Sequence, residues 1–270
     1  DNYITLTERV TDHLGERPAH LPRQRMWKVR AGQTVLAQGA HERPLVFSGN
    51  DLPGVMLSGA VRSYITRYGV VPGNRTVVFT NNDDAYRTAL ALHGAGAHVV
   101  VVDLRRDLKG ELVKAVRAAG IEVMSGSAVT IAAGTQRIAR VEISPVNEGA
   151  TQVLDDPIHM DCDLLAMSGG LTPAVHLHSQ ARGKLGWDDQ QLCFKPTTVH
   201  EASFNAGAGN GVFATDKAIE NGMQAGTAAA RAAGFDIADG SAPEVAAPAQ
   251  SWRPLAAWKV TNGMGEGEGP

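Results

Sequence analysis

The chain opens with short segments in which apolar and polar residues alternate, the period of a strand with one buried face. Residues 3–7, 26–29 and 34–37 show this pattern, and the last segment ends at Gly39. The next apolar residues recur at helical spacing, and Gly69 and the Pro72-Gly73 pair are expected to end this helix. The apolar residues at helical spacing are Leu57, Ala60, Val61, Tyr64, Ile65 and Tyr68. We therefore predict strands followed by an amphipathic helix.

The centre of the chain carries the clearest periodicity. A strand at 76–79, a polar turn at 80–83, a helix to about residue 93 and an apolar strand at 99–102 form a βαβ unit. A second helix with one apolar face leads into a strand at 121–124, which predicts a doubly wound parallel sheet. Further strands are predicted around 128–132, 138–143 and 163–167, and an Ala-rich helix at about 215–233.

Composition narrows the class of protein. The 270 residues, 43% of them hydrophobic, are enough for one or two cores. The net charge of −3 and the lack of a Lys/Arg-rich run argue against a nucleic-acid or membrane partner, and no run of apolar residues is long enough to cross a bilayer. Cys162 and Cys193 are too few for a disulfide framework or a four-Cys metal site, which favours a reducing, cytoplasmic setting.

The turn of the central βαβ unit lacks glycine, whereas a dinucleotide usually needs glycines there so that its pyrophosphate can approach the helix amides. Asp83 and Asp84 place carboxylates at that position, where they would satisfy the helix amides and repel a phosphate. We predict a capped structural turn, with an unusual nucleotide site as the alternative. Asp103 stands where an acid usually meets a ribose, but Arg105 and Arg106 beside it would suit a phosphate, so the signal is ambiguous. The structural alternative is a strand-end acid paired with a neighbouring arginine.

Two other turns have the small residues that close backbone approach requires. One follows the strand at 34–37 and contains Gly39 and Ala40. The other, at 205–211, precedes the helix that begins near Thr215, whose amides and dipole favour an anion. Packing or flexibility would explain such turns equally well.

Conventional catalytic signatures are missing from the sequence. His176 and His178 could share one face of a strand as metal ligands, but Pro173 suits the first turn of a helix, on which the two would diverge. No Gly-x-Ser-x-Gly elbow is present, and neither cysteine lies in a nucleophile motif. We assign no catalytic residue and no metal ligand.

The stretch 38–60, QGAHERPLVFSGNDLPGVMLSGA, continuing through 68–69 and the residues FTNNDDAYR at 79–87, resembles the alpha subunit of heterotetrameric sarcosine oxidase. The resemblance extends from Tyr3 to Phe235, and the glycine-free turn is itself a feature of that family. It implies a complex that demethylates sarcosine oxidatively to glycine, forming hydrogen peroxide and methylene-tetrahydrofolate. FAD and FMN belong to the intact complex, and the beta, gamma and delta subunits are the implied partners.

The same resemblance implies that this subunit holds a tightly bound NAD. By position, the contacts fall on Ala208, Phe213 and Thr215 with the flanking Gly207 and Gly209, and less strongly on Gly39 and Ala40, which line the same lobe. The family's own GxGxxG turn and its C-terminal folate-binding domain have no counterpart in these residues. We therefore expect an incomplete first lobe, an isolated fragment without activity, and tetrahydrofolate binding through a domain absent from this sequence.

The sequence thus predicts an α/β, Rossmann-like fold with two nucleotide-binding-type lobes. The first comprises 1–66 with 160–235, the second is an inserted lobe at 70–158, and the Ala-, Pro- and Gly-rich residues 239–270 are expected to be a disordered tail. The leading function is the NAD-holding core of the alpha subunit. The alternatives are a flavin-dependent NAD(P)H oxidoreductase and a non-catalytic scaffold that docks other subunits.

Overall fold

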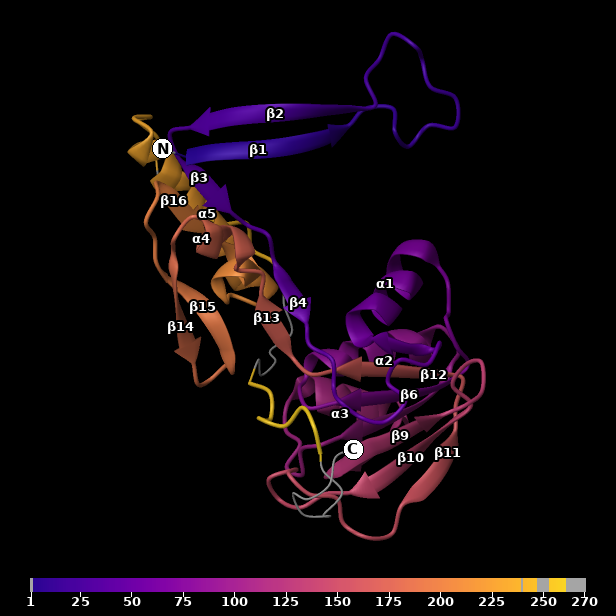
Figure 1. The fold of residues 1–270 in the computed structure, drawn as a ribbon. Coiled ribbons are helices and arrows are strands. Elements are labelled where there is room, and N and C mark those ends of the chain that lie inside the picture. The colour runs from indigo at the N-terminus through magenta and orange to yellow at the C-terminus, as the bar shows by residue number, and fades with distance from the viewer. Residues whose placement is uncertain (1, 239, 247–252, 261–270) are drawn as a thin grey trace, which may run out of the picture. The chain divides into compact units, whose positions relative to one another are not determined.

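The computed structural model describes residues 2–238, 240–246 and 253–260 (Figure 1). It divides into two compact units, each of which is assembled from several stretches of the chain. Unit 1 comprises Asp1–Ala40, Pro173–Trp187 and Phe194–Ala246, and unit 2 comprises His41–Thr172, Asp188–Cys193 and Ala247–Pro270. The chain is therefore an α/β protein in which one unit interrupts the sequence of the other.

Unit 2 is built on a five-stranded sheet in the order β5-β12-β6-β7-β8, in which all neighbours are parallel. Its strands are β5 (Val55–Leu57), β12 (Leu164–Ser168), β6 (Arg75–Thr80), β7 (His98–Asp103) and β8 (Glu122–Ser125). The helices of this unit are α1 (Ser58–Tyr68), α2 (Asp84–Gly94) and α3 (Glu111–Ala118). The antiparallel sheet β11-β10-β9 consists of β9 (Ser127–Ala133), β10 (Arg140–Pro145) and β11 (Ile158–Asp161).

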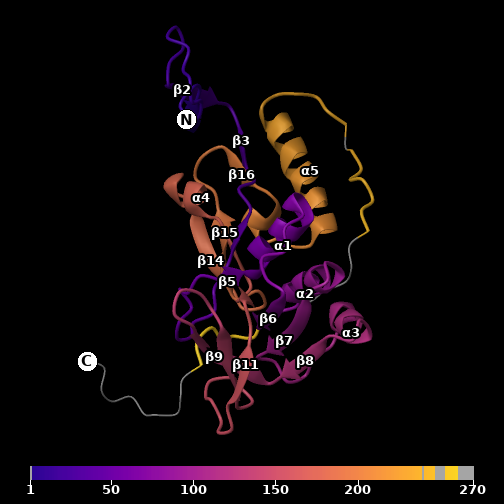
Figure 2. The same cartoon turned by 90° about the vertical axis from the view of Figure 1, so that its right-hand side faces the viewer.

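Both faces of the parallel sheet are buried, as a parallel sheet requires. Because side chains alternate along a strand, Val77 and Phe79 enter one core whereas Val78 enters the other. The core that contains Val78 packs under the three helices, and the core that contains Phe79 includes residues of β9 and β10. In Figure 2 the helices α2 and α3 lie on one side of β6–β8 and the strand β9 on the other. Unit 2 is thus a three-layered α/β fold.

Unit 1 contains shorter elements. Its strands are β1 (Asn2–Arg9), β2 (Gln24–Ala31), β3 (Thr34–Leu36) and β16 (Ser203–Asn205), with β14 (Lys184–Asp188) and β15 (Cys193–Thr198) reaching the unit boundary. Its helices are α4 (His176–Gln180), the 3₁₀ turn η1 (Gly207–Asn210) and α5 (Thr215–Ala232). β1 and β2 form an antiparallel hairpin, and β3 pairs in parallel with β16. The chain enters and leaves unit 2 through β4 (Ala40–Glu42) and β13 (Leu171–Pro173), which pair with each other.

Most of the predicted elements are confirmed, including the central βαβ unit and its extension to β8. Gly69 ends α1 in the left-handed conformation, with φ of 63°. The unit boundaries differ from the predicted lobes, because residues 41–66, 160–172 and 188–193 belong to unit 2, where β5 pairs with β12. The periodicity of 41–66 could not show this, since the pairing partner lies about a hundred residues away. Among the described residues, no helix is both long enough and apolar enough to cross a membrane.

The expectation of a disordered tail at 239–270 is wrong for residues 253–260. Ala257 is buried in the core of unit 2, and Lys259 forms a parallel bridge with Val46. Composition alone misled the prediction, because hydrogen bonds to unit 2 hold this segment in place. The rest of the predicted tail is described at 240–246, and positions 239, 247–252 and 261–270 lie outside the described residues.

Candidate functional site

The two glycine turns singled out in the sequence meet in unit 1. Their strands, β3 and β16, are parallel, so both turns leave the same edge of the pair. The amide of Ala206 donates to the carbonyl of Leu36 at 2.9 Å. A Cβ built on Gly209 would lie 3.5 Å from both the amide nitrogen and the carbonyl oxygen of Gly39. Residues about 170 positions apart therefore form one small-residue surface.

Backbone conformation explains why glycine stands at two of these positions. Gly39 has φ of 79° and Gly207 has φ of 61°, the left-handed region that other residues adopt at a cost. A Cβ on Gly39 would meet no atom within 4 Å, and one on Gly207 would meet only the Cβ of Ala218 at 3.9 Å. The space beside these two turns is thus free of neighbouring side chains, as the approach of a ligand requires.

The helix that follows leaves its N-terminus open. α5 begins at Thr215, and no side chain caps it at Ala214. An uncapped helix presents unpaired amides, which suit a phosphate or carboxylate. Asp216 lies in the same turn, so hydrogen-bonding amides rather than net charge are the main attraction for an anion. Thr215 is exposed and Phe213 is partly buried, so both predicted contact residues lie beside this N-terminus.

A residue that the sequence analysis missed fixes the turn. Asn221, on the second turn of α5, accepts a hydrogen bond from the amide of Gly207 at 2.9 Å, and Asn210 reaches the same oxygen at 3.5 Å. An asparagine within an Ala-rich helix is the signal that could have revealed it, because this residue type favours caps over helix interiors. Asn221 holds η1 against the start of α5.

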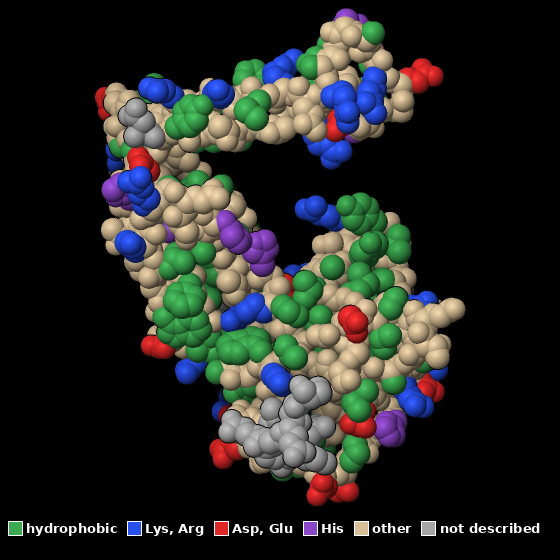
Figure 3. All heavy atoms as spheres, in the orientation of Figure 1, with side chains coloured by type: hydrophobic (Ala, Val, Ile, Leu, Met, Phe, Trp, Pro, Cys, Tyr) green, Lys and Arg blue, Asp and Glu red, His purple; other side chains and the backbone are tan. Residues whose placement is uncertain are grey.

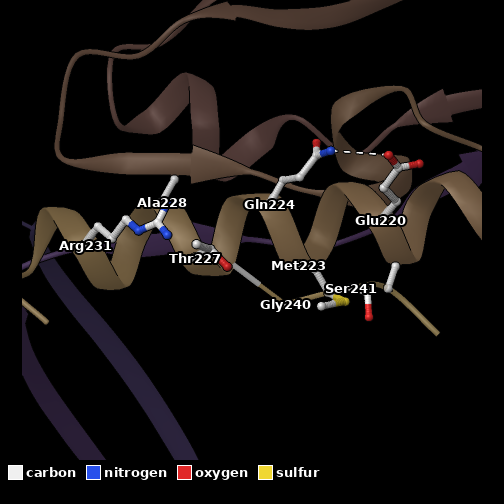
Figure 4. A pocket seen from close by; sticks show the side chains of 9 residues that line it. Glu220, Met223, Gln224, Thr227, Ala228, Arg231, Gly240 and Ser241 are labelled. Atoms are coloured by element: carbon white, nitrogen blue, oxygen red, sulfur yellow. Dashed lines mark hydrogen bonds between the residues drawn. The ribbon is translucent and has the colours of Figure 1, made fainter. Parts of the chain in front are cut away.

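Two grooves border unit 1 elsewhere. One, of about 490 Å³, follows the side of α5, and Figure 4 shows Gln224 directed toward Glu220 along it. The other, of about 410 Å³, lies along β3 and β1 and is lined by Thr34, Leu36 and Tyr3 among others. None of the predicted cofactor residues lines either groove. The glycine surface therefore lies apart from both grooves.

The corresponding turn in unit 2 is filled by side chains. Arg105 donates to Asp83 at 2.7 Å and to Asp103 at 2.7 and 3.0 Å, and Tyr86 donates its hydroxyl to Asp103 at 2.8 Å. Burial disfavours the charge on Arg105, but its bonds to the two aspartates outweigh burial and raise its pKa. Asp103 is therefore a strand-end acid paired with a neighbouring arginine, which was the structural alternative.

The predicted capping role of Asp83 is wrong in detail. No side chain caps α2 from position 83, because the carboxylate of Asp83 pairs with Arg105. Asn82 takes this place, and its Oδ1 accepts the amide of Asp84 at 3.0 Å. Asp84 pairs instead with Arg62 at 3.0 Å. The turn is structural, as predicted, but its polar groups are used in a different combination.

The two histidines of the sequence analysis lie on the short helix α4, which confirms the helical interpretation. His178 is buried, and its Nε2 lies 3.0 Å from the carbonyl of Lys184. Its Nδ1 lies 3.1 Å from the amide nitrogen of Asn205, so the ring nitrogens are both used within the protein. In the parts of the chain that are described, no group of three or more His, Cys, Asp or Glu side chains is placed to hold a metal ion.

Comparison with solved structures agrees with this architecture. Thioredoxin reductase from T. acidophilum superimposes with a TM-score of 0.57 over 77% of this chain and 67% of that structure, at 15% identity. At this level of identity the similarity establishes the fold alone, which is a Rossmann-like α/β fold. No protein-family model matches the chain.

Sequence comparison identifies the relatives. The alpha subunit of sarcosine oxidase from Corynebacterium sp. (strain P-1) is 40% identical over 266 residues, which are 98% of this chain and 27% of that subunit. The same subunit from Rhizobium meliloti (strain 1021) is 40% identical over 198 residues, or 72% of this chain and 18% of that protein. The chain is therefore a homologue of the sarcosine oxidase alpha subunit over nearly its whole length, and it spans about a quarter of the relatives that it matches.

Proposed function

We propose that this chain is the NAD-holding part of a sarcosine oxidase alpha subunit, and that unit 1 binds the pyrophosphate of NAD. The observation that carries the proposal is the meeting of Gly39 with Gly209 ahead of the uncapped N-terminus of α5. Glycine turns at the carboxyl ends of parallel strands, followed by an open helix, are the arrangement that a dinucleotide pyrophosphate requires. The backbone amides would bind the pyrophosphate, and the glycines leave the space that it needs.

The remaining predicted contacts complete this arrangement. Ala208 lies in η1 and Phe213 in the turn between η1 and α5, and Thr215 can add its hydroxyl to the amides of the first helical turn. Ala40 follows Gly39 at the same sheet edge. We propose, from the resemblance to the sarcosine oxidase alpha subunit, that NAD when bound is a static cofactor that does not turn over. Oxidation of sarcosine belongs, on this proposal, to a flavin of the beta subunit, and the intact complex contains FAD and FMN.

The proposal also names partners. The relatives are subunits of sarcosine oxidase. We infer docking to beta, gamma and delta subunits and to a tetrahydrofolate-binding domain, and a cytoplasmic location.

One observation favours a docking role for unit 2 itself: apolar side chains gather over α1 in Figure 3. Tyr64 and Tyr68 are 45% and 70% exposed, and their ring centroids lie 6.1 Å apart. Such a patch is typical of a contact surface.

A charge placed at the helix N-terminus tests the NAD site. The Thr215→Asp variant puts a carboxylate where the phosphate would bind, and Thr215→Asn is the matched neutral control. Bound nucleotide is released by denaturing each purified protein and identified by mass spectrometry. We expect NAD in the parent and in Thr215→Asn, with about a tenfold or greater reduction in Thr215→Asp. Equal NAD in both variants, or FAD in place of NAD, would contradict the proposal.

A further inference from the structure

The sheet of unit 2 has a topological switch point between β6 and β12. From β6 the chain proceeds through α2, β7, α3 and β8 to one side, whereas β12 lies on the other side of β6. In doubly wound sheets, ligands bind in the crevice outside the carboxyl ends of the strands at such a point. The two turns that border it here are residues 80–83 after β6 and residues 168–170 after β12.

Residues 253–260 of the same chain are bound at the first of these turns. Asn81 accepts the amide of Leu255 at its carbonyl, at 2.9 Å. Its side-chain amide donates to the carbonyls of Leu255 and Ala257, at 2.9 and 3.1 Å. Asn81 is fully buried, so this side chain is committed to the segment.

The same segment is also bound at the second turn. The indole Nε1 of Trp258 donates to the carbonyl of Gly169 at 2.6 Å, and the carbonyl of Trp258 accepts the amide of Val46 at 2.7 Å. Leu255, Trp258 and Val260 pack against the buried core. The segment therefore bridges both turns of the switch point.

A cation lies beneath this segment. The guanidinium of Arg43 is 4.5 Å from the ring centroid of Trp258 and donates to the carbonyl of Leu192 at 2.7 Å. Its Nε and Nη2 are buried and have no hydrogen-bond partner. A Cβ on Gly170 would lie 2.9 Å from Nη2, so glycine at position 170 keeps the space beside the guanidinium open. Guanidinium N–H groups without a partner, beside a glycine, are groups that can bind a phosphate at a switch point.

We propose that residues 253–260 are a built-in occupant of the nucleotide crevice of unit 2, and that they keep a dinucleotide out. They use the hydrogen-bonding groups of Asn81 and Gly169, and the ring of Trp258 covers Arg43. The carboxylates of the turn already have cationic partners, because Arg62 pairs with Asp84 and Arg105 is shared by Asp83 and Asp103. This inference concerns unit 2 and does not depend on NAD binding in unit 1.

The test compares two shortened chains, one ending at residue 252 and a matched control ending at residue 260. ADP-ribose binding is measured by calorimetry on both, in the Thr215→Asp background, so that a site in unit 1 does not contribute. We expect the chain ending at 252 to bind ADP-ribose at least about tenfold more tightly than the control. Arg43→Met in the shorter chain should abolish the gain. A folded shorter chain without gained affinity would overturn the proposal.

The full-length chain offers a second route if the shorter chain does not fold. Trp258→Ala uncovers Arg43, whereas Trp258→Phe keeps an aromatic ring above it. ADP-ribose affinity should rise about tenfold in the first variant and stay unchanged in the second. In the unsubstituted protein, the amides of Val46 and Leu255 should exchange hydrogen at least about 100-fold more slowly than in a free peptide. Exchange at the free-peptide rate would show that the segment does not occupy the crevice.

Discussion

Each unit contains a strand, a turn and a helix in succession, but the two turns use their polar groups in opposite ways. In unit 1 the turn between β16 and α5 contains three glycines, and no side chain caps the helix. In unit 2 the turn between β6 and α2 contains none, and Asn82, Asp83 and Arg105 bind one another or the backbone there. A strand–turn–helix is open to a ligand only where its own side chains leave the backbone amides unused.

A second helix of unit 2 follows the same rule. The carboxylate of Glu42 accepts the amide of Gly59 at 2.7 Å, at the N-terminus of α1. An acid from a preceding strand thus takes the position that an external anion would take. Side chains thus accept amides at the starts of α1 and α2 in unit 2, whereas no side chain caps α5 of unit 1.

The largest expected effect comes from removing the cation of the unit 2 turn. Arg105→Met removes the cation that Asp83 and Asp103 share, and these side chains are only 3% and 0% exposed. Breaking a buried ion pair by removing one partner costs about 3–5 kcal/mol, because the remaining charge stays buried. Urea unfolding should report this loss in the free energy of unfolding of unit 2.

Lys114→Met is the matched control for that substitution. Lys114 pairs with Glu111 at 3.0 Å, but the two side chains are 75% and 65% exposed. An exposed pair of this kind contributes less than about 0.5 kcal/mol. Similar losses in both variants would mean that the side chains of the unit 2 turn do not stabilise it as the comparison requires.

The contrast between the two units also explains how far the sequence could be interpreted. Periodicity predicts β6, α2, β7 and α5 because each of these elements is defined by neighbours a few residues away. The absence of glycine at 80–85 correctly predicts a structural turn. The sequence could not predict the hydrogen-bond partner of Asp83. Its carboxylate binds Arg105 rather than the amides of its own helix, and spacing alone does not distinguish these partners.

Contacts between residues far apart in the sequence were harder still to predict. Gly39 and Gly209 were both candidates, yet only the parallel pairing of β3 with β16 shows that they lie together. Residues 239–270 were expected to be disordered from their composition as a whole, since Ala-, Pro- and Gly-rich sequences rarely form a core, but residues 253–260 within them contain Leu255, Trp258 and Val260 and no glycine. Its order depends on hydrogen bonds to Asn81 that no local pattern reveals.

Backbone strain in the unit 1 turn gives the next largest effect. Gly39→Ala forces a residue with a Cβ to keep φ near 79°, which costs about 1–2 kcal/mol. Gly32→Ala is the control, because Gly32 has no positive φ and a Cβ there would meet no atom within 4 Å. Thermal unfolding of unit 1 should show the loss in the first variant alone. Equal stability of the two variants would mean that the turn does not need its left-handed glycine.

The internal carboxylate at α1 predicts a dependence on pH. Burial raises the pKa of Glu42, and the hydrogen bond from Gly59 offsets this only in part. A raised folded-state pKa favours the protonated form, so its stabilising contribution is complete below the ordinary value of 4.5 and is lost as pH rises through the raised pKa. Glu42→Gln stays neutral, and its free energy of unfolding should increase relative to the parent as pH rises above that value.

Denaturant unfolding of both proteins between about pH 4 and pH 8 measures this difference, and the contributions of titrating groups that do not interact with Glu42 cancel in it. A difference that stays constant over this range would mean that burial does not disfavour the ionised carboxylate of Glu42.

The smallest expected effect is a gain in stability, from placing an acidic residue at the helix N-terminus of unit 1, as unit 2 does at α1. Thr215→Asp supplies α5 with an acid at its first position, and an acid there stabilises a helix by about 0.3–1 kcal/mol at low ionic strength. Thermal unfolding of nucleotide-free protein should show this gain for Thr215→Asp and not for Thr215→Asn, and salt should reduce it. A gain in stability together with loss of NAD would show that the open helix N-terminus of unit 1 exchanges stability for binding. Loss of stability in the nucleotide-free variant would instead mean that an internal group of unit 1 already satisfies the start of α5, as Glu42 does for α1.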